Sequence, residues 1–414
     1  MQGDQLPVRA TRGELPDAAR LAGDTGAALV DRVRELHEAI AGRSFGPTGG
    51  ASTPARAVHD GIARAVYTGV RGGVRAAAGV LGTVADHHPR GRAAKPFSHD
   101  PRGRFVLGAV NGWLGDRLEA QGSTLAVPLA VRHEGEDVPC TPDALAAAFP
   151  DATPHVVVFL HGLMESEEAW RLGAADRPTY GEALARHGWS PVLLRANTGL
   201  HVHENGRRLA ALLEDLVAAW PAGVQRLALV GHSMGGLVLR SACHQAAEEG
   251  RAWPRQVKHV VTLGTPHTGA PLERLAARGA SLLHRLPEGR PVAAVLRSRS
   301  VGIKDLRHGA LVATDWAGDD LDALLDDACG EVPLPEGVRH HVVAATLHRD
   351  PDHPVSRLLG DLLVQSASAH GKSARRTIPF EVDDLRHVGG LTHFALLNHP
   401  AVLELLEDWL GTPR

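Results

Sequence analysis

The 414-residue sequence predicts an α/β protein with a mostly parallel sheet flanked by helices. From about residue 123 onward, short β-branched runs alternate with helical stretches, which is typical of parallel strands joined by crossover helices. Residues 155–160 form a nearly continuous apolar run, as expected for a strand buried on both faces. We expect strands at 125–131 (a strand or hairpin), 155–160, 191–194, 227–230, 257–263, 341–345 and 378–382.

Helices are expected between these strands. In the stretch 209–220 the apolar residues recur at i, i+3, i+4 and i+7, and 235–247 and 402–410 also fit helices. The segment 267–337 begins with an amphipathic stretch containing Leu282, Leu283 and Leu286. It is too long for a simple connection, so we expect a cap or lid there. Residues 1–121 show helical spacing interrupted by Pro and Gly clusters. They are expected to form an N-terminal helical extension to a domain at 122–414.

Composition and charge exclude some classes of function. The formal net charge of −3 gives no electrostatic reason to expect a nucleic-acid partner. Cys140, Cys243 and Cys329 are odd in number and show neither metal-ligand spacing nor a disulfide framework, which favours a reducing compartment. The polar amino terminus lacks the layout of a secretory signal, and no run approaches about 20 apolar residues. We therefore expect a cytoplasmic protein.

The pattern Gly-x-Ser-x-Gly occurs twice, around Ser44 and around Ser233. A serine nucleophile needs a strand that ends in a sharp turn opening into a helix, because that turn exposes the hydroxyl. Ser233 follows the expected strand 227–230 and precedes a helix. Ser44 instead follows the helical stretch 29–40, where Gly42 fits a helix C-cap. The context favours Ser233 as the nucleophile and Ser44 as a chance match.

Such a serine also needs N–H donors for the negative oxygen of the tetrahedral intermediate. The backbone N–H of Met234, directly after the nucleophile at the start of the helix, is one candidate. The second donor normally comes from a loop after an earlier strand. His161-Gly162-Leu163-Met164 directly follows the strand 155–160, although His161-Gly162 also fits a simple turn at a strand end.

Three motifs in this order carry a family resemblance: His161-Gly162-Leu163, residues 231–236 (Gly-His-Ser-Met-Gly-Gly) and residues 263–269 (Leu-Gly-Thr-Pro-His-Thr-Gly). The sequence from about 123 to the C-terminus resembles the bacterial lipase/esterase branch of the α/β-hydrolases, a group that includes glycosylphosphatidylinositol inositol-deacylase-like proteins. The resemblance implies the α/β-hydrolase fold with a cap insertion. It also implies Leu163, the residue after His-Gly, as the second oxyanion donor.

In this fold the catalytic triad runs in the order Ser, then Asp or Glu, then His. His393 lies on a loop after the last expected strand and ahead of the closing helix, which matches the family's catalytic-histidine position. His387 and His399 are alternatives, and both also fit solvated loop histidines. His399 is disfavoured because it directly precedes Pro400 at the start of that helix.

The acid of the triad orients the imidazole and stabilises its charged form. The segment 360–367 resembles the lipase segment in which an aspartate precedes a Val and a Ser-Ala pair, so Asp361 is the candidate. The family pattern often has Gly after this aspartate, and here the residue is Leu362. Asp350 and Asp352 are alternatives, because they lie closer to the end of the strand 341–345.

Two further signals have less weight. His348, Asp350, Asp352 and His353 are close together, but serine chemistry needs no metal and a polar loop explains them, so we expect neither a metal nor a cofactor. In 58–84, apolar residues fall on one side of a helix, and Arg64, Arg71 and Arg75 cluster on the other. Such a helix can contact an anionic membrane or lipid surface, although packing against the hydrolase domain is favoured.

The sequence therefore predicts a serine hydrolase that cleaves carboxylic esters, an esterase or lipase acting on a small-molecule or lipid ester. A thioesterase, an amidase or an acyltransferase would use the same residues. A non-catalytic hydrolase-like protein, bound to a lipid or protein surface by its N-terminal helices, is the alternative from another class. The full set of catalytic positions argues against this last reading.

Overall fold

The computed structural model describes residues 14–45, 64, 68, 71, 72, 75, 76, 97–174, 176–270, 273, 283, 290–316, 329–381 and 384–411. These residues belong to two units. The first unit takes its described residues from 1–97, 118–126 and 275–299, and the second from 98–117, 127–274 and 300–414. The expected boundary at residues 121 and 122 stays a prediction.

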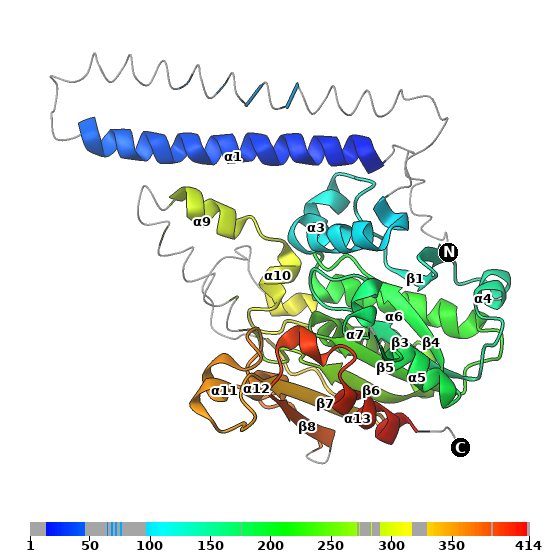
Figure 1. The fold of residues 1–414 in the computed structure, drawn as a ribbon. Coiled ribbons are helices and arrows are strands. Elements are labelled where there is room, and N and C mark those ends of the chain that lie inside the picture. Colours follow the sequence, from blue (N-terminus) through cyan, green and yellow to red (C-terminus); the bar gives the residue numbers. More distant parts are fainter. Residues whose placement is uncertain are drawn as a thin grey trace. The chain divides into compact units, whose positions relative to one another are not determined.

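The second unit is built on one eight-stranded sheet, which is mostly parallel as expected (Figure 1). The strand order is β2-β1-β4-β3-β5-β6-β7-β8. Strands β3 to β8 run parallel, whereas β1 is antiparallel to both β2 and β4. The strands are β1 (Ala130–His133), β2 (Glu136–Val138), β3 (His155–Leu160), β4 (Ser190–Arg195), β5 (Arg226–His232), β6 (Val257–Leu263), β7 (Arg339–Thr346) and β8 (Leu385–Gly389).

The central strands are buried on both faces, which explains their continuous apolar sequence. In β3, Val156 and Val158 belong to one apolar core together with α6 (Val202–Ala219) and α7 (Met234–Glu248). Val157 and Phe159 belong to a second core together with α5 (Tyr180–Arg186) and α13 (Pro400–Leu410). The expected helices 235–247 and 402–410 correspond closely to α7 and α13.

The remaining helices lie in connections and at the ends of the described segments. They are α1 (Glu14–Phe45), α3 (Pro101–Ala120), α4 (Pro142–Ala148), α9 (Arg290–Arg297), α10 (Val301–Asp305), α11 (Pro354–Leu359) and α12 (Ser366–Ala369). Short 3-10 helices occur at Phe97–His99, Glu167–Arg171, Trp253–Gln256, Ala313–Trp316 and His393–Leu396.

Two of the expected strands differ from the structure. The first strand begins at Ala130, and residues 125–129 are not part of it, because the amide of Ala126 bonds to the carbonyl of Ser123 in a turn. The expectation of a strand at 378–382 is wrong for 378–381. Pro379 cannot donate a ladder hydrogen bond, and the amide of Phe380 turns back to the carbonyl of Ile378. The last strand is β8, and residue 382 lies outside the described residues.

The surroundings of Ser44 also differ from the expectation. Helix α1 continues to Phe45, so Gly42 lies within the helix and the assignment of Gly42 as its C-cap is wrong. The absence of a strand-to-helix turn at Ser44 agrees with its interpretation as a chance match to the motif.

The first unit contains ion pairs to α1 from the arginine-rich stretch. Arg71 Nε lies 3.4 Å from Asp31 Oδ2, and Arg75 Nε lies 3.4 Å from Asp24 Oδ1. The apolar positions of 58–84 that we expected on one helix side lie outside the described residues. None of the described helices has the length and apolar character needed to cross a bilayer. Membrane contact through 58–84 stays a prediction.

The described parts of 267–337 include the helices α9 and α10 and the 3-10 helix Ala313–Trp316. Of the three leucines in the expected amphipathic stretch, Leu283 is helical, and Leu282 and Leu286 lie outside the described residues. The role of this segment as a cap stays a prediction.

Candidate active site

Ser233 occupies the turn between β5 and α7. Its backbone has φ 52° and ψ −123°, a sparsely populated conformation for a residue with a side chain. The turn is held by two hydrogen bonds: the Ser233 amide donates to the carbonyl of Leu263 (2.8 Å), and the Gly236 amide donates to the carbonyl of Ser233 (3.1 Å). The strand thus ends in a strained bend that opens directly into a helix.

The two glycines of the motif are required by space. A Cβ on Gly231 would lie 2.6 Å from the Gly236 nitrogen, and a Cβ on Gly235 would lie 2.5 Å from the carbonyl oxygen of Leu160. Both distances are shorter than real Cβ contacts. Glycine at both positions therefore allows β5, α7 and the end of β3 to pack closely around Ser233.

His393 and Asp361 are in direct contact. His393 Nδ1 lies 2.7 Å from Asp361 Oδ2, and the His393 amide donates to the Asp361 carbonyl (3.0 Å). The other carboxylate oxygen of Asp361 accepts from the amides of Leu363 and Val364. Because the carboxylate is acceptor-only when ionised, Nδ1 carries the proton and Nε2 is left as the basic nitrogen. Nε2 is buried and has no hydrogen-bond partner among the described residues.

His393 and Ser233 lie on either side of the segment that follows β6. Ser233 bonds to the carbonyl of Leu263, and the next residue, Gly264, packs against the ring of His393. A Cβ on Gly264 would lie 3.1 Å from His393 Cε1. In addition, the rings of His393 and His232, the residue before the nucleophile, have centroids 4.8 Å apart. Ser233 and His393 thus both adjoin the segment Leu263-Gly264.

The alternatives for the base and the acid are engaged elsewhere. His387 Nε2 is 2.7 Å from the Thr346 hydroxyl, and His399 Nδ1 accepts from the Ala401 amide at the N-terminus of α13. Asp350 and Asp352 are exposed, and Asp352 pairs with Arg357. None of the four contacts the Ser233 turn or the Asp361–His393 pair in the described structure.

The two residues expected to supply the oxyanion donors lie next to Ser233 in the chain (Met234) and in the loop after β3 (Leu163). Met234 is the first residue of α7, so its N–H has no partner within the helix. Leu163 is half-buried in the loop after β3, and that loop approaches the nucleophile closely: a Cβ on Gly162 would lie 2.9 Å from the Ser233 Cβ. This loop is fixed to β4 through His161, whose Nε2 accepts from the Ala196 amide while Nδ1 donates to the Gly162 carbonyl.

A buried ion pair that the sequence did not predict lies beside the nucleophile turn. Glu165 and His232 are both buried, and His232 Nδ1 lies 2.9 Å from Glu165 Oε1. Glu165 Oε2 also accepts from the Gly162 amide (2.7 Å), and His232 Nε2 lies 3.3 Å from the carbonyl oxygen of His393. The pair therefore connects the oxyanion loop, the nucleophile turn and the catalytic-histidine loop.

The hydrogen bonds define the charge state of this pair. A carbonyl oxygen only accepts, so His232 Nε2 donates to it, and Nδ1 donates to the carboxylate. With both nitrogens protonated, His232 is an imidazolium. Burial alone would lower the pKa of His232, but the nearby charge and hydrogen bond of Glu165 raise it above its usual value. Burial likewise opposes ionisation of Glu165, and His232 and the Gly162 amide nevertheless hold its pKa below the usual value. The sequence signals were a glutamate three residues after Gly162 and a histidine ending an apolar strand.

The candidate metal residues form no metal centre in the described structure. The rings of His348 and His353 stack with centroids 3.9 Å apart, and the Asp350 amide bonds to His348 Nδ1. Among all described residues, no group of three or more His, Cys, Asp or Glu side chains is arranged to hold a metal ion. Cys140 and Cys243 form no disulfide within the described residues.

Comparison with known proteins gives a family match for part of the chain. Residues 151–311 match the family model described as "Putative serine esterase (DUF676)". This range includes Leu163, Ser233 and Met234 and ends before Asp361 and His393. None of the curated proteins matches the chain.

Solved structures similar to the chain include a lipase and two esterases. The lipase BlEst2 of Bacillus licheniformis is 19% identical, and the similarity covers 63% of this chain and 92% of the lipase with a TM-score of 0.40. The esterase PF2001 of Pyrococcus furiosus is 15% identical over 63% of this chain and 83% of its own, with a TM-score of 0.34. The hyperthermophilic esterase of Pyrobaculum calidifontis is 14% identical over 63% and 76%, with a TM-score of 0.35.

The sheet topology, the serine turn after β5 and the family match all point the same way. The chain has the sheet topology of the α/β-hydrolase fold, and its residues 151–311 are similar to a family described as serine esterases.

Proposed function

We propose that the protein hydrolyses carboxylic esters through an acyl-enzyme on Ser233. The observation that carries this proposal is the 2.7 Å contact between His393 and Asp361 next to the strained serine turn. His393 Nε2 is the basic nitrogen and has no hydrogen-bond partner among the described residues, so it is available to take the Ser233 proton as Oγ attacks the ester carbonyl.

The backbone N–H groups of Leu163 and Met234 stabilise the negative oxygen of the tetrahedral intermediate. As the intermediate collapses, the carbon–oxygen bond to the alcohol breaks and His393 returns the proton to the leaving oxygen. Water, activated by the same histidine, then attacks the acyl-enzyme and releases the carboxylic acid. Asp361 holds the imidazole with Nδ1 protonated throughout, and no metal or cofactor is needed.

The substrate class is a small-molecule or lipid ester. The expected cap at 267–337, whose sequence contains the apolar helical stretch with Leu282, Leu283 and Leu286, supports an apolar acyl chain. A thioester, an amide or an acyl acceptor other than water would use the same groups. The sequence alone suggests two further hypotheses. They are contact with a lipid surface through 58–84 and a cytoplasmic location.

A fluorophosphonate probe tests the proposal directly, since it reacts only with an activated serine. We expect stoichiometric labelling of the wild type, no labelling of Ser233→Ala, and full labelling of Ser44→Ala, which alters the other Gly-x-Ser-x-Gly match. A panel of p-nitrophenyl esters of graded chain length then defines the acyl preference. A wild-type chain that is folded but unreactive with the probe would favour the non-catalytic, surface-binding alternative.

A further inference from the structure

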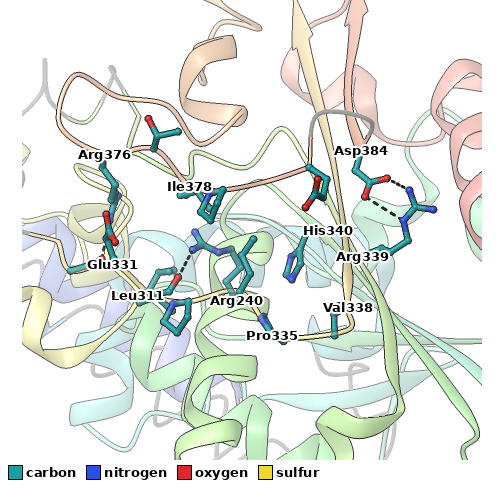
Figure 2. A pocket seen from close by; sticks show the side chains of 17 residues that line it. Arg240, Leu311, Glu331, Pro335, Val338, Arg339, His340, Arg376, Ile378 and Asp384 are labelled. Atoms are coloured by element: carbon teal, nitrogen blue, oxygen red, sulfur yellow. Dashed lines mark hydrogen bonds and ion pairs between the residues drawn. The ribbon is translucent and has the colours of Figure 1, made fainter.

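A cavity of about 740 Å³ lies at the amino-terminal end of β7, within the second unit (Figure 2). Its lining includes Arg339 and His340, the first two residues of β7, and Arg240 of α7. In parallel strands the amino and carboxyl ends lie at opposite edges of the sheet, and the proposed catalytic residues follow the carboxyl ends of β5, β7 and β8. None of those catalytic residues lines this cavity. It is a separate site.

Arg240 supplies a buried cation to the cavity. Its side chain is 5% exposed, and its contacts are long: Nη1 lies 3.5 Å from His267 Nδ1, and Nη2 donates to the Val332 carbonyl at 3.4 Å. No described carboxylate lies within 4 Å of it. Burial, with a contribution from the charge of Arg376, lowers the pKa of Arg240 to about 10, so the group is still charged at neutral pH. A buried charge normally has a paired counter-charge, and here the described residues provide none.

Two neighbouring groups leave polar atoms buried without partners. His340 is 7% exposed, and its Nε2 has no hydrogen-bond partner among the described residues. Burial and the charge of Arg240 lower its pKa to about 3, so the ring is neutral and Nε2 can carry a proton to donate. Arg376 donates to the carbonyls of His267 and His308, and its Nε is buried without a partner.

The acidic residues of the cavity do not neutralise these groups. Asp384 forms an ion pair with Arg339 (2.6 Å), as the dashed lines in Figure 2 show. Glu331 and Glu381 line the cavity but are exposed, and neither forms an ion pair with the described residues. Of the three carboxylates only Asp384 is buried, and it is paired with Arg339, whereas Arg240 has no such partner among the described residues. Apolar side chains, among them Leu311, Val338 and Ile378, complete the lining.

We propose that this cavity binds a small organic anion, with its carboxylate on Arg240 and His340 Nε2 and a short apolar chain against Val338 and Ile378. The carboxylate would supply the counter-charge that the buried guanidinium lacks, and it would accept the proton of the unpartnered histidine nitrogen. The apolar lining favours a carboxylate with a short aliphatic chain over an inorganic anion. The proposal does not depend on the esterase assignment.

Isothermal titration of the full chain with sodium hexanoate tests the proposal, with sodium chloride at matched ionic strength as the reference. If the fluorophosphonate labels Ser233, the labelled protein is used for the titration. Binding of hexanoate at the proposed active site then does not contribute to the signal. We expect saturable one-site binding of hexanoate, weaker binding of acetate and weaker binding of inorganic phosphate. Arg240→Met should weaken hexanoate binding at least tenfold. Arg102→Met removes the same charge from an exposed position outside the cavity and should leave binding unchanged.

A second variant and a second measurement separate ligand binding from a structural role of Arg240. Glu331→Gln removes a negative charge from the rim and should tighten hexanoate binding. Without added anion, the Tm of Arg240→Met should be no lower than that of the wild type. Hexanoate should raise the Tm of the wild type but not that of Arg240→Met. The proposal is overturned if hexanoate acts no differently from chloride, if Arg240→Met retains wild-type affinity, or if phosphate binds more tightly than hexanoate.

Discussion

The carboxylate of Glu165 lies 2.9 Å from the imidazole of His232, which directly precedes the proposed nucleophile. The same carboxylate accepts a hydrogen bond from the Gly162 amide. The other ring nitrogen, His232 Nε2, donates to the carbonyl of His393. A buried imidazolium normally needs a counter-charge, and Glu165 supplies it, so the pair can hold the three loops in place.

The first prediction concerns Glu165→Gln. The amide cannot balance an imidazolium, so His232 should lose a proton and the contacts to Gly162 and His393 should weaken. Since small displacements of reacting groups cost up to about 100-fold in rate, we expect kcat to fall by about 10- to 100-fold with little change in KM. Steady-state hydrolysis of p-nitrophenyl butyrate measures this. Glu168→Gln is the control, because Glu168 pairs with Arg104 rather than with the site, and equal losses in the two variants would argue against a positioning role.

The same pair predicts a pH dependence of stability. The pKa of His232 is raised, so its contribution is complete below its ordinary value of 6.5 and is lost as the pH rises through the raised value. The pKa of Glu165 is lowered, so its contribution is complete above 4.5 and is lost as the pH falls through the lowered value. The pair should therefore stabilise the fold most between these two ordinary values.

Urea unfolding of the wild type and Glu165→Gln at several pH values measures this contribution. Breaking a buried pair costs about 3 kcal/mol, so we expect a difference of that order at pH 5.5 and a smaller one well above the raised pKa of His232. A difference between the two proteins that does not change with pH would show that the charges are not its source.

Asp361→Asn tests the assignment of the acid. Asparagine keeps the shape but favours the wrong tautomer of His393, so we expect kcat to fall by about 10⁴-fold while fluorophosphonate labelling of Ser233 continues slowly. Asp350→Asn and Asp352→Asn, which alter the two alternatives, should keep full activity. An unchanged rate in Asp361→Asn, with a loss in one of the other two, would transfer the role to that residue.

The sequence was most informative where structure is local. A buried strand, a glycine-flanked serine and a following helix lie within about 20 residues, and these elements appear in the structure as β5, Ser233 and α7. The error at 378–381 has a local cause as well, since two apolar side chains there are buried but Pro379 breaks the ladder. Apolar content alone does not distinguish a buried strand from an irregular segment whose apolar side chains are also buried.

Contacts between distant residues could not be derived in the same way. Glu165 and His232 are 67 positions apart, and neither residue type indicates the other. Only a resemblance to a family segment indicates Asp361 in the sequence. Between Asp361 and His393 lies β8, and the apolar pattern predicts that strand at 378–382 instead. The topology of the sheet, rather than any sequence spacing, brings these side chains together.

Gly264 offers a test of how closely the backbone must approach His393. Gly264→Ala places a methyl group about 3 Å from the imidazole, so we expect kcat to fall by at least about tenfold as the ring is displaced. Gly250 has nearly the same backbone conformation (φ 65° against 60°) but open space around it. Gly250→Ala should therefore share the backbone strain, about 1 kcal/mol, and keep normal kinetics. If the two variants have the same activity, the contact with His393 has no catalytic effect.

Leu362, directly after Asp361, stands where the family pattern often has glycine, and the structure gives the reason for that preference. Its φ is 90°, a conformation that costs a residue with a side chain about 1–3 kcal/mol, and its side chain is 55% exposed and so contributes little packing. Leu362→Gly should therefore raise the free energy of unfolding by about 1 kcal/mol, because relief of strain exceeds the added flexibility of the unfolded chain. Val106→Gly, at a similarly exposed site (60%) inside helix α3, should instead lower it by about 1 kcal/mol. Urea unfolding of both variants gives the two signs, and a loss of stability in Leu362→Gly comparable to that in Val106→Gly would mean that the turn holding Asp361 is not strained at this residue.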